Sequence, residues 1–234
     1  MHIGLLLFPN LTQLDLTGPH AVFARMPDTT VHLVWKNREP VASGAPGLGL
    51  SILPTTTFAE CPPLDVICVP GGPGQLEIMD DQETLDFLRR QSVQAKWITS
   101  VCTGSLILGA AGLLKGYRAT CHWASLDQLS LFGAEPVPER VVIDRNRATG
   151  GGVTAGIDFA LTLAARMHGE DTAKAIQLGM EYDPAPPFAS GSPRTADPAL
   201  VARLRRQMAP WLAQRHAVNL RAAGRLNRPA SPGA

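Results

Sequence analysis

Cys102 lies in a segment whose residue types and spacing point to a nucleophile. The apolar, β-branched residues 97–101 lead into this cysteine, and the helix-forming residues 106–111 follow almost at once. Ser100 and Gly104 are small, as they must be where a strand turns sharply into a helix around a nucleophile. In such a turn the cysteine has a strained backbone at a helix N-terminus, whose N–H groups and dipole favour the thiolate. The segment therefore predicts a cysteine nucleophile elbow.

A carboxyl group that could assist this thiol follows the first expected strand. Residues 3–8 are apolar at nearly every position, which is typical of a central parallel strand covered on both faces. Asp15 comes soon afterwards, between Leu14 and Leu16. Open α/β sheets bind ligands at the carboxyl ends of their strands, so Asp15 is a candidate acid or base. The alternative is an ordinary turn or helix-capping aspartate.

Two glycine-rich turns are expected near the same edge of the sheet. Residues 70–74 follow the buried strand 64–69 and offer backbone amides, but the lysine and serine of a phosphate-binding loop are missing. Such a turn is often only punctuation, although its amides could donate to a developing charge if it meets Cys102. Residues 150–152 mainly permit a tight strand-to-helix turn, which could also flex when the cysteine is modified.

The elements that must position these residues alternate between strands and helices, with short loops between them. This pattern predicts a three-layer α/β sandwich around a mainly parallel sheet. We expect a single domain over residues 1–228 and a disordered tail at 229–234. Further strands are expected at residues 30–36, 50–53, 117–121, 134–138, 141–144 and 147–149, and helices at 81–95, 157–168, 170–182 and 198–223.

Composition restricts the function classes. The 234 residues are 45% hydrophobic and 18% charged with a formal net charge of +1, which is typical of a globular protein and gives no case for nucleic acid or an anionic membrane. The apolar N-terminal run is too short to span a membrane and lacks the basic region of a signal peptide, so we expect a cytoplasmic protein.

The four cysteines and the late arginines have structural interpretations. The cysteines show no C-x-x-C spacing and no paired histidines accompany them, so we expect free thiols and no zinc site. Cys61, Cys68 and Cys121 are interpreted as packing residues. The amphipathic helix 198–223 and the residues after it are expected to carry a solvated basic face and tail, formed by Arg203, Arg205, Arg206, Arg215, Arg221, Arg225 and Arg228.

Several segments together resemble the DJ-1/PfpI superfamily, which has the class I glutamine amidotransferase-like fold. They span nearly the whole chain and comprise the first strand leading to Asp15 and residues 70–72, 100–104, 119–123 and 149–152. Within the superfamily, residues 14–19, 102–104 and 181–188 look most like the isocyanide hydratase branch.

The resemblance implies a cofactor-independent lyase that hydrates an isocyanide to an N-substituted formamide. Cys102 would attack the terminal carbon and form a thioimidate, and Asp15 would supply a proton and then help to activate water. The apolar neighbours of Asp15 would favour its protonated form. Thr103 would orient substrate or water, or equally would be a plain residue of the first helical turn.

Four further residues are expected around the pocket. The Gly72 amide would complete the polar lining, with His122, Trp123 and Gly151 also placed at the substrate. His122 falls where DJ-1 carries a histidine, but the resemblance to isocyanide hydratase implies no catalytic role for it, and Trp123 is core or pocket wall. The resemblance implies a homodimer and requires no metal or cofactor.

Departures from other branches limit the alternatives. PfpI-type peptidases carry a histidine where this chain has Thr103, and DJ-1-type glyoxalases carry a glutamate where it has Asp15. Amidotransferases use a Cys-His-Glu triad with a distant histidine, and we expect neither His168 nor His216 to complete such a triad. Glyoxalase-like chemistry on small dicarbonyls is therefore disfavoured.

Two non-hydratase interpretations stay open. One is a regulatory protein, because similar segments occur in the N-terminal domains of AraC-type regulators. A pair of helix-turn-helix units would need about a hundred residues after Ala234, so such a protein is not expected to bind DNA. The other is a redox-stress protein with a reversibly oxidised Cys102.

Overall fold

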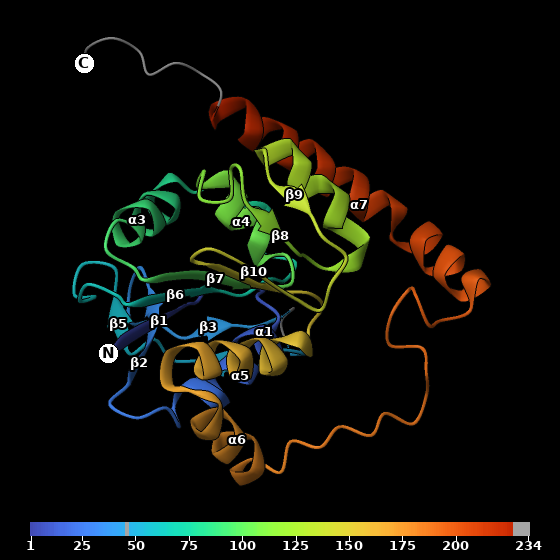
Figure 1. Ribbon diagram of the computed structural model, residues 1–234. Helices are drawn as coiled ribbons and strands as arrows, with labels where there is room; N and C mark the ends of the chain where they lie inside the picture. The colour runs from blue at the N-terminus through green and yellow to red at the C-terminus, as the bar shows by residue number, and fades with distance from the viewer. Residues whose placement is uncertain (45–46, 227–234) are drawn as a thin grey trace, which may run out of the picture.

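A seven-stranded sheet lies at the centre of the computed structural model, which describes residues 1–44 and 47–226 (Figure 1). The strand order is β10-β11-β7-β6-β1-β2-β5, and every neighbouring pair is parallel except the antiparallel pair β10 and β11. The predicted tail at 229–234 lies outside the described residues. The strands are β1 (His2–Leu6), β2 (Thr30–Trp35), β5 (Thr56–Thr57), β6 (Val66–Val69), β7 (Trp97–Val101), β10 (Val141–Asp144) and β11 (Arg147–Gly150).

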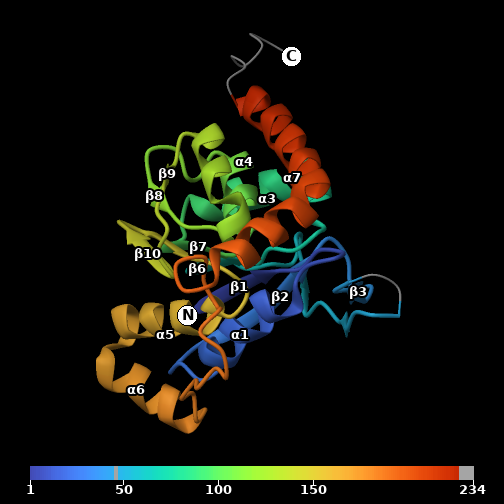
Figure 2. The same ribbon diagram turned by 90° about the vertical axis from the view of Figure 1, so that its right-hand side faces the viewer.

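Helices cover both faces of this sheet (Figures 1 and 2). On one face lie α3 (Gln82–Ser92) and α4 (Gly104–Ala110), with the short α2 (Gln75–Ile78) and the 3₁₀ segment η1 (Trp123–Phe132) packed against α4. On the other face lie α1 (Gln13–Phe23) and α5 (Ala155–His168), and α6 (Glu170–Gly179) packs on α5. The predicted three-layer α/β sandwich with a mainly parallel sheet is confirmed.

Smaller elements complete the chain. Two short two-stranded pieces pair β3 (Val41–Ala42) with β4 (Ser51–Ile52) and β8 (Arg118–Ala119) with β9 (Glu135–Pro136). The last helix, α7 (Pro198–Leu226), crosses the α4 side of the molecule and contacts both α4 and η1 (Figure 2). Among the described residues, no helix combines the length and apolar character that a bilayer span requires.

The buried strands and the amphipathic helix α3 follow from their sequences. All four residues of β6 are buried, because helices cover both faces of the sheet. In α3 the apolar residues Leu85, Phe87 and Leu88 are buried as predicted, while the Asp81 side chain caps the helix by accepting a hydrogen bond from the Thr84 backbone N–H (3.4 Å).

One predicted helix is shorter in the structure, and one segment of the structure was not predicted. The helix expected to reach residue 182 ends at Gly179, because Glu181 takes a left-handed backbone conformation (φ 50°) that a helix cannot continue. The ten-residue segment η1 was not predicted, since its sequence lacks a clear helical period and it forms 3₁₀ turns.

The prediction of a solvated arginine face is wrong for Arg215. This side chain is only 1% exposed, because its face of α7 packs against α4 and η1 together with Val218, Asn219 and Ala222. Arg225 is half-buried and donates to the Met79 carbonyl oxygen (2.6 Å). The other arginines of the predicted face that the structure describes, Arg203, Arg205, Arg206 and Arg221, are exposed, and Arg228 lies outside the described residues.

Candidate active site

Cys102 stands at the turn between β7 and α4 in a left-handed backbone conformation (φ 58°), which is uncommon for a residue with a side chain. Its backbone N–H donates to the carbonyl oxygens of Gly150 (3.0 Å) and Gly151 (2.8 Å), which hold the turn in place. A Cβ atom at Gly104 would overlap the Val69 carbonyl oxygen, so glycine is needed there. The predicted elbow is therefore present, with the Cys102 side chain buried.

Asp15 lies in the first turn of α1, fully buried and beside the elbow. Thr12 occupies the N-cap position of that helix, so Asp15 is not the capping residue. One carboxyl oxygen, Oδ2, accepts a hydrogen bond from the Gly71 backbone N–H (2.9 Å). The other, Oδ1, has no hydrogen-bond partner among the residues that the structure describes. One side of the carboxyl group is thus fixed and the other is free to exchange a proton.

The acidities of Asp15 and Cys102 are linked. Burial raises the pKa of Asp15 from 3.8 to about 7, and the Gly71 amide and the Cys102 thiol oppose this rise by smaller amounts. Burial also raises the pKa of the Cys102 thiol well above its usual value; the charges of Asp15 and Cys121 add to the rise, and the Thr103 backbone amide opposes it. The Asp15 charge makes the Cys102 thiol harder to ionise, whereas the thiol helps Asp15 to ionise, so the pair retains a proton at neutral pH.

Thr103 ties the elbow to the glycine turn that follows β6. Its hydroxyl Oγ1 is buried and accepts a hydrogen bond from the Gly72 backbone N–H (3.0 Å). At Gly71 a Cβ atom would overlap both the Thr103 amide and its hydroxyl, and would crowd Asp15 Oδ2 at 3.0 Å. The turn at residues 70–72 therefore lies against Thr103, the residue after Cys102, and the Gly72 amide is used by Thr103.

The opposite side of the elbow is held by a chain of buried hydroxyl groups. Ser100 Oγ and Ser105 Oγ share a hydrogen bond (2.8 Å), and Ser105 Oγ donates to the Thr120 carbonyl oxygen (2.6 Å). The Thr120 backbone N–H donates to Thr149 Oγ1 (2.9 Å). These bonds bring the segment that carries Cys121 and His122 against the first turn of α4.

The three other predicted pocket residues occupy different places. Gly151 donates its N–H to the Arg140 carbonyl oxygen (2.9 Å) and accepts from Cys102, so both of its backbone groups are engaged within the protein. His122 lies beside the same turn, since a Cβ at Gly152 would be 3.6 Å from His122 Cδ2. Its Nδ1 accepts from the Ala124 N–H (3.3 Å).

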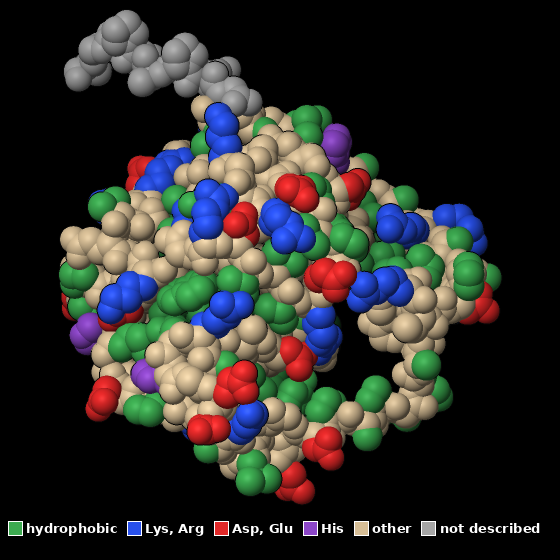
Figure 3. Space-filling view, viewed as in Figure 1, with side chains coloured by type: hydrophobic (Ala, Val, Ile, Leu, Met, Phe, Trp, Pro, Cys, Tyr) green, Lys and Arg blue, Asp and Glu red, His purple; other side chains and the backbone are tan. Residues whose placement is uncertain are grey.

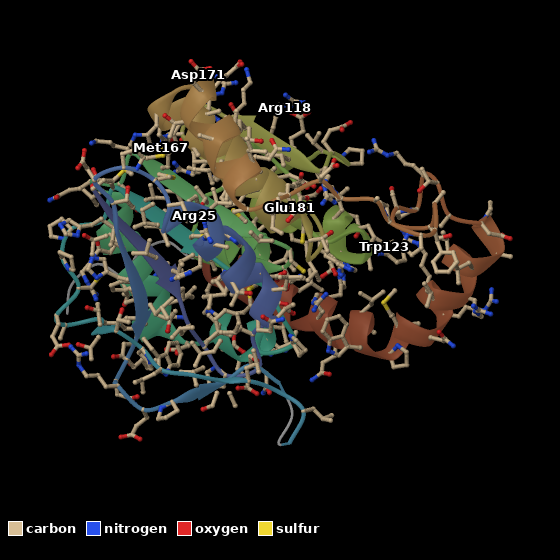
Figure 4. All side chains as sticks on the ribbon, turned by 90° about the horizontal axis from the view of Figure 1, so that it is seen from below. Arg25, Arg118, Trp123, Met167, Asp171 and Glu181 are labelled. Carbon is tan, nitrogen blue, oxygen red and sulfur yellow. The ribbon has the colours of Figure 1, made fainter. Side chains whose placement is uncertain are left out.

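Trp123 lies beside the segment that leads into α7 (Figure 4). The Arg205 guanidinium lies 5.0 Å from its ring centroid. Together with residues of that segment it lines a cavity of about 70 Å³. The structure thus gathers Cys102, Asp15 and Thr103 with the glycine turns, has His122 at their edge and has Trp123 farther out.

Arg215 is the residue near this site that sequence reasoning missed. Its Nη1 donates to Ser125 Oγ (2.7 Å), and Ser125 is three residues from His122. A signal for its burial is present in the sequence: Arg215, Val218 and Ala222 recur at helical spacing, so the arginine shares a face with apolar residues. Its position within a run of other arginines concealed this pattern.

Neither a metal cluster nor a cysteine pair is found around the elbow. No group of three or more His, Cys, Asp and Glu side chains among the described residues is placed to hold a metal ion. All four cysteines have free thiols as predicted, with Cys68 and Cys121 buried and Cys61 half-buried.

An α/β sandwich with a buried cysteine on a left-handed elbow and a buried carboxyl group beside it defines a class of cysteine-dependent proteins. This chain belongs to the DJ-1/PfpI family, whose family model matches residues 1–166. The superfamily resemblance noted in the sequence is thereby confirmed.

Three relatives refine the comparison. The chain is 59% identical over 227 residues to an isonitrile hydratase of Pseudomonas putida, covering 97% of this chain and 98% of that protein. A crystal structure of a ThiJ/PfpI family protein from Pseudomonas syringae superposes with a TM-score of 0.89 at 46% identity, covering 93% of this chain and 90% of the other. The transcriptional regulator GbdR of Pseudomonas aeruginosa (strain UCBPP-PA14) is 38% identical over 137 residues, which cover 58% of this chain but only 37% of the regulator.

The buried carboxyl group has a consequence for stability. Since the pKa of Asp15 rises from 3.8 to about 7 on folding, ionising it costs free energy only in the folded state. The neutral Asp15 carboxyl group makes its full contribution to the free energy of unfolding below about pH 4. This contribution is lost as the pH rises through about 7. We therefore expect Asp15→Asn to be more stable than the wild type at pH 8, by up to about 4 kcal/mol, with the difference shrinking towards pH 4.

Urea unfolding of both proteins at pH 5 and pH 8 measures this difference, and Asp86→Asn, an exposed carboxylate on α3, is the control. If the stability of Asp15→Asn relative to the wild type is the same at pH 5 and pH 8, Asp15 is not held at a raised pKa.

Proposed function

We propose that this protein is an isonitrile hydratase, an enzyme that converts an isocyanide and water into an N-substituted formamide. The observation that carries the proposal is the 59% identity to the Pseudomonas putida isonitrile hydratase over 97% of the chain. The site adds a chemical reason, because a buried thiol beside a carboxyl group of raised pKa suits nucleophilic attack coupled to proton transfer.

The first step uses the proton that Asp15 and Cys102 share. The Asp15 carboxylate accepts the thiol proton, and the resulting sulfur lone pair attacks the terminal carbon of the isocyanide. A carbon–sulfur bond forms, and the electron pair left on that carbon takes the proton back from Asp15. The product is a thioimidate, R–N=CH–S–Cys102, with Asp15 ionised again.

The second step hydrolyses the thioimidate. Asp15 accepts a proton from a water molecule whose oxygen attacks the same carbon, and then delivers this proton to the nitrogen. The carbon–sulfur bond breaks as the carbon–oxygen double bond forms, and the hydroxyl proton returns to the Asp15 and Cys102 pair. The formamide leaves, and the pair again carries the one proton with which it began.

Thr103 is proposed as the residue that fixes this arrangement. Its amide lies next to Cys102 and opposes the rise in the thiol pKa, and its hydroxyl holds the Gly72 amide at 3.0 Å. Gly71, the residue before Gly72, donates its backbone N–H to Asp15, so the same turn orients both reacting groups. Contact of Gly72, Gly151, His122 or Trp123 with the substrate stays a prediction.

Incubation of the purified protein with a simple alkyl isocyanide tests the function. Loss of the isocyanide matched by an equal amount of N-alkyl formamide is expected. Protein that leaves the isocyanide unchanged under conditions where Cys102 is reduced would overturn the assignment.

We also propose a homodimer. Residues 183–189 run along an opening at the side of the molecule (Figures 1 and 3), and Phe188 in this segment is 77% exposed. The first half of α7 is exposed as well, including Leu204. Exposed apolar side chains of this kind are commonly covered in an assembly.

Sedimentation equilibrium checks this proposal. We expect twice the chain mass of 25.0 kDa, and we expect Phe188→Asp with Leu204→Asp to weaken self-association by at least about tenfold. Val93→Asp, at an exposed residue in the C-cap position of α3, is the control. A wild-type mass of one chain throughout the micromolar range would contradict the proposal.

The remaining proposals concern organisation and location. Residues 1–228 are proposed as one domain, because one hydrophobic cluster runs from β1 to α7. The four free thiols favour a reducing compartment, and we propose the cytoplasm. The formal net charge of +1 favours no nucleic-acid or membrane partner.

A further inference from the structure

Arg215 is a buried cation without a buried anion beside it. Its side chain is 1% exposed, it stacks on Trp211 with the guanidinium carbon 3.4 Å from the ring centroid, and its Nη1 donates to Ser125 Oγ. Its Nε and Nη2 have no hydrogen-bond partner among the described residues. Buried arginines are ordinarily paired with a carboxylate, because an unpaired buried charge is costly. The missing anion therefore calls for an explanation.

The contacts of Arg215 lead to the elbow. Ser125, which accepts from Arg215, donates its backbone N–H to the His122 carbonyl oxygen (2.8 Å). Two residues before His122, the Thr120 carbonyl oxygen accepts from Ser105 in the first turn of α4. Arg215 is thus joined through one short segment to the turn that carries Cys102.

The charge of Arg215 also acts on the groups along this path. It lowers the pKa of His122 and opposes the rise in the pKa of the Cys121 thiol, both of which are set first by burial. Burial lowers the pKa of Arg215 itself to about 10, while Cys121 and Cys102 oppose that change. The guanidinium is therefore charged at neutral pH, and the charges of Cys121 and Cys102 both favour its charged form.

We propose that Arg215 is a positioning residue of the active site, the counter-cation of the single negative charge that Asp15 and Cys102 share. When the proton moves from sulfur to carboxyl, the charge moves to Cys102, and the fixed guanidinium stabilises it there. An electrostatic partner held in advance by Trp211 and Ser125 needs no rearrangement during the reaction. The inference deepens the proposed function, since it rests on Cys102 being the nucleophile.

The groups that set the ionisation of Cys102 come from four parts of the fold. Asp15 on α1 and Cys121 before η1 disfavour the thiolate, and the Thr103 amide favours it. His122, whose pKa is lowered by burial and by Arg215, is neutral near pH 7. Asp127 on η1 adds to the rise in the pKa of Cys121. Arg215 is the cation that α7 contributes here, and it opposes that rise.

Alkylation of Cys102 by iodoacetamide tests the proposal without any substrate, so its outcome is independent of whether isocyanides are turned over. The rate at the Cys102 peptide is followed by mass spectrometry from pH 5 to pH 10. The pH at which this rate reaches a set value, called the midpoint below, reports how readily the thiolate forms. Arg215→Met and Arg215→Gln remove the charge, and Arg215→Lys keeps it. Arg221→Gln removes an exposed cation from the same helix and is the control.

We expect the neutral variants to raise the midpoint by one pH unit or more, which is a tenfold lower rate at neutral pH. The Lys variant and the Arg221→Gln control are expected to stay within half a unit of the wild type. Thermal unfolding is expected to leave Arg215→Met as stable as the wild type, because an unpaired buried charge is replaced by an apolar chain.

An unchanged midpoint in a folded neutral variant overturns the proposal, and so does an equal shift in the Lys variant, because shape rather than charge would then set the midpoint. If neither neutral variant folds, the Lys variant decides: a midpoint near the wild-type value supports the proposal, and a shift of one unit overturns it.

Discussion

Cys102→Ala is expected to lower kcat/KM for an alkyl isocyanide by on the order of 10⁴-fold or more, because it removes the sulfur that forms the carbon–sulfur bond of the thioimidate. The fold should survive, since the residue at this position is held through its backbone N–H, which donates to Gly150 and Gly151. Alanine retains that donor and is no worse than cysteine at a positive φ. Formamide release measured by nuclear magnetic resonance checks the expectation, with circular dichroism confirming the fold.

Cys61→Ala is the matched control. Cys61 is a half-buried free thiol whose pKa is raised to about 11 by burial, and it lies apart from the elbow. We expect wild-type activity from this variant. Formamide production by Cys102→Ala at a tenth of the wild-type rate or more would rule out Cys102 as the nucleophile.

Asp15→Asn is expected to lower kcat/KM by about 10²- to 10⁴-fold, the range typical of a lost general acid or base. The amide oxygen can still accept from the Gly71 N–H, so the geometry of the turn should be kept while proton transfer is lost. Higher stability at pH 8 together with lower activity would identify Asp15 as a group kept for chemistry at a cost in stability.

The pH profile of the wild type gives a second measure of Asp15. The active form carries one proton on the Asp15 and Cys102 pair, and a second proton is added as the pH falls through the raised Asp15 pKa of about 7. We therefore expect kcat/KM to decline below about pH 7, by tenfold per unit at lower pH. Asp86→Asn should reproduce this profile. A wild-type profile that stays flat down to pH 5 would contradict the assignment.

The sequence was sufficient for the parts of the site that depend on local pattern. A β-branched run, a cysteine between small residues and an apolar helix predict the elbow at Cys102, because few backbones other than this turn require that order. Asp15 was a candidate only by its place after the first strand. Its burial and its bond to Gly71 depend on packing between distant segments, which no local pattern specifies.

The parts that escaped prediction depend on tertiary contacts. Arg215 resembles its exposed neighbours in composition, and only the contact of α7 with η1 and α4 buries it. The Gly72 amide was expected to face the substrate, whereas the structure has it donating to Thr103. Trp123 follows His122 directly in sequence, yet it lies by the segment before α7, because the 3₁₀ turns of η1 begin at that point.

The covalent intermediate on Cys102 is the central claim, and an acid-quench experiment tests it most directly. The wild-type protein is mixed with an isocyanide carrying ¹³C at the isocyano carbon, quenched during the first turnovers, digested and analysed by mass spectrometry. We predict that the Cys102 peptide carries the full mass of the labelled isocyanide, that Cys121 carries none, and that the label then appears in the formamide carbonyl. Labelled formamide formed while the Cys102 peptide stays unmodified at every quench time would contradict the mechanism.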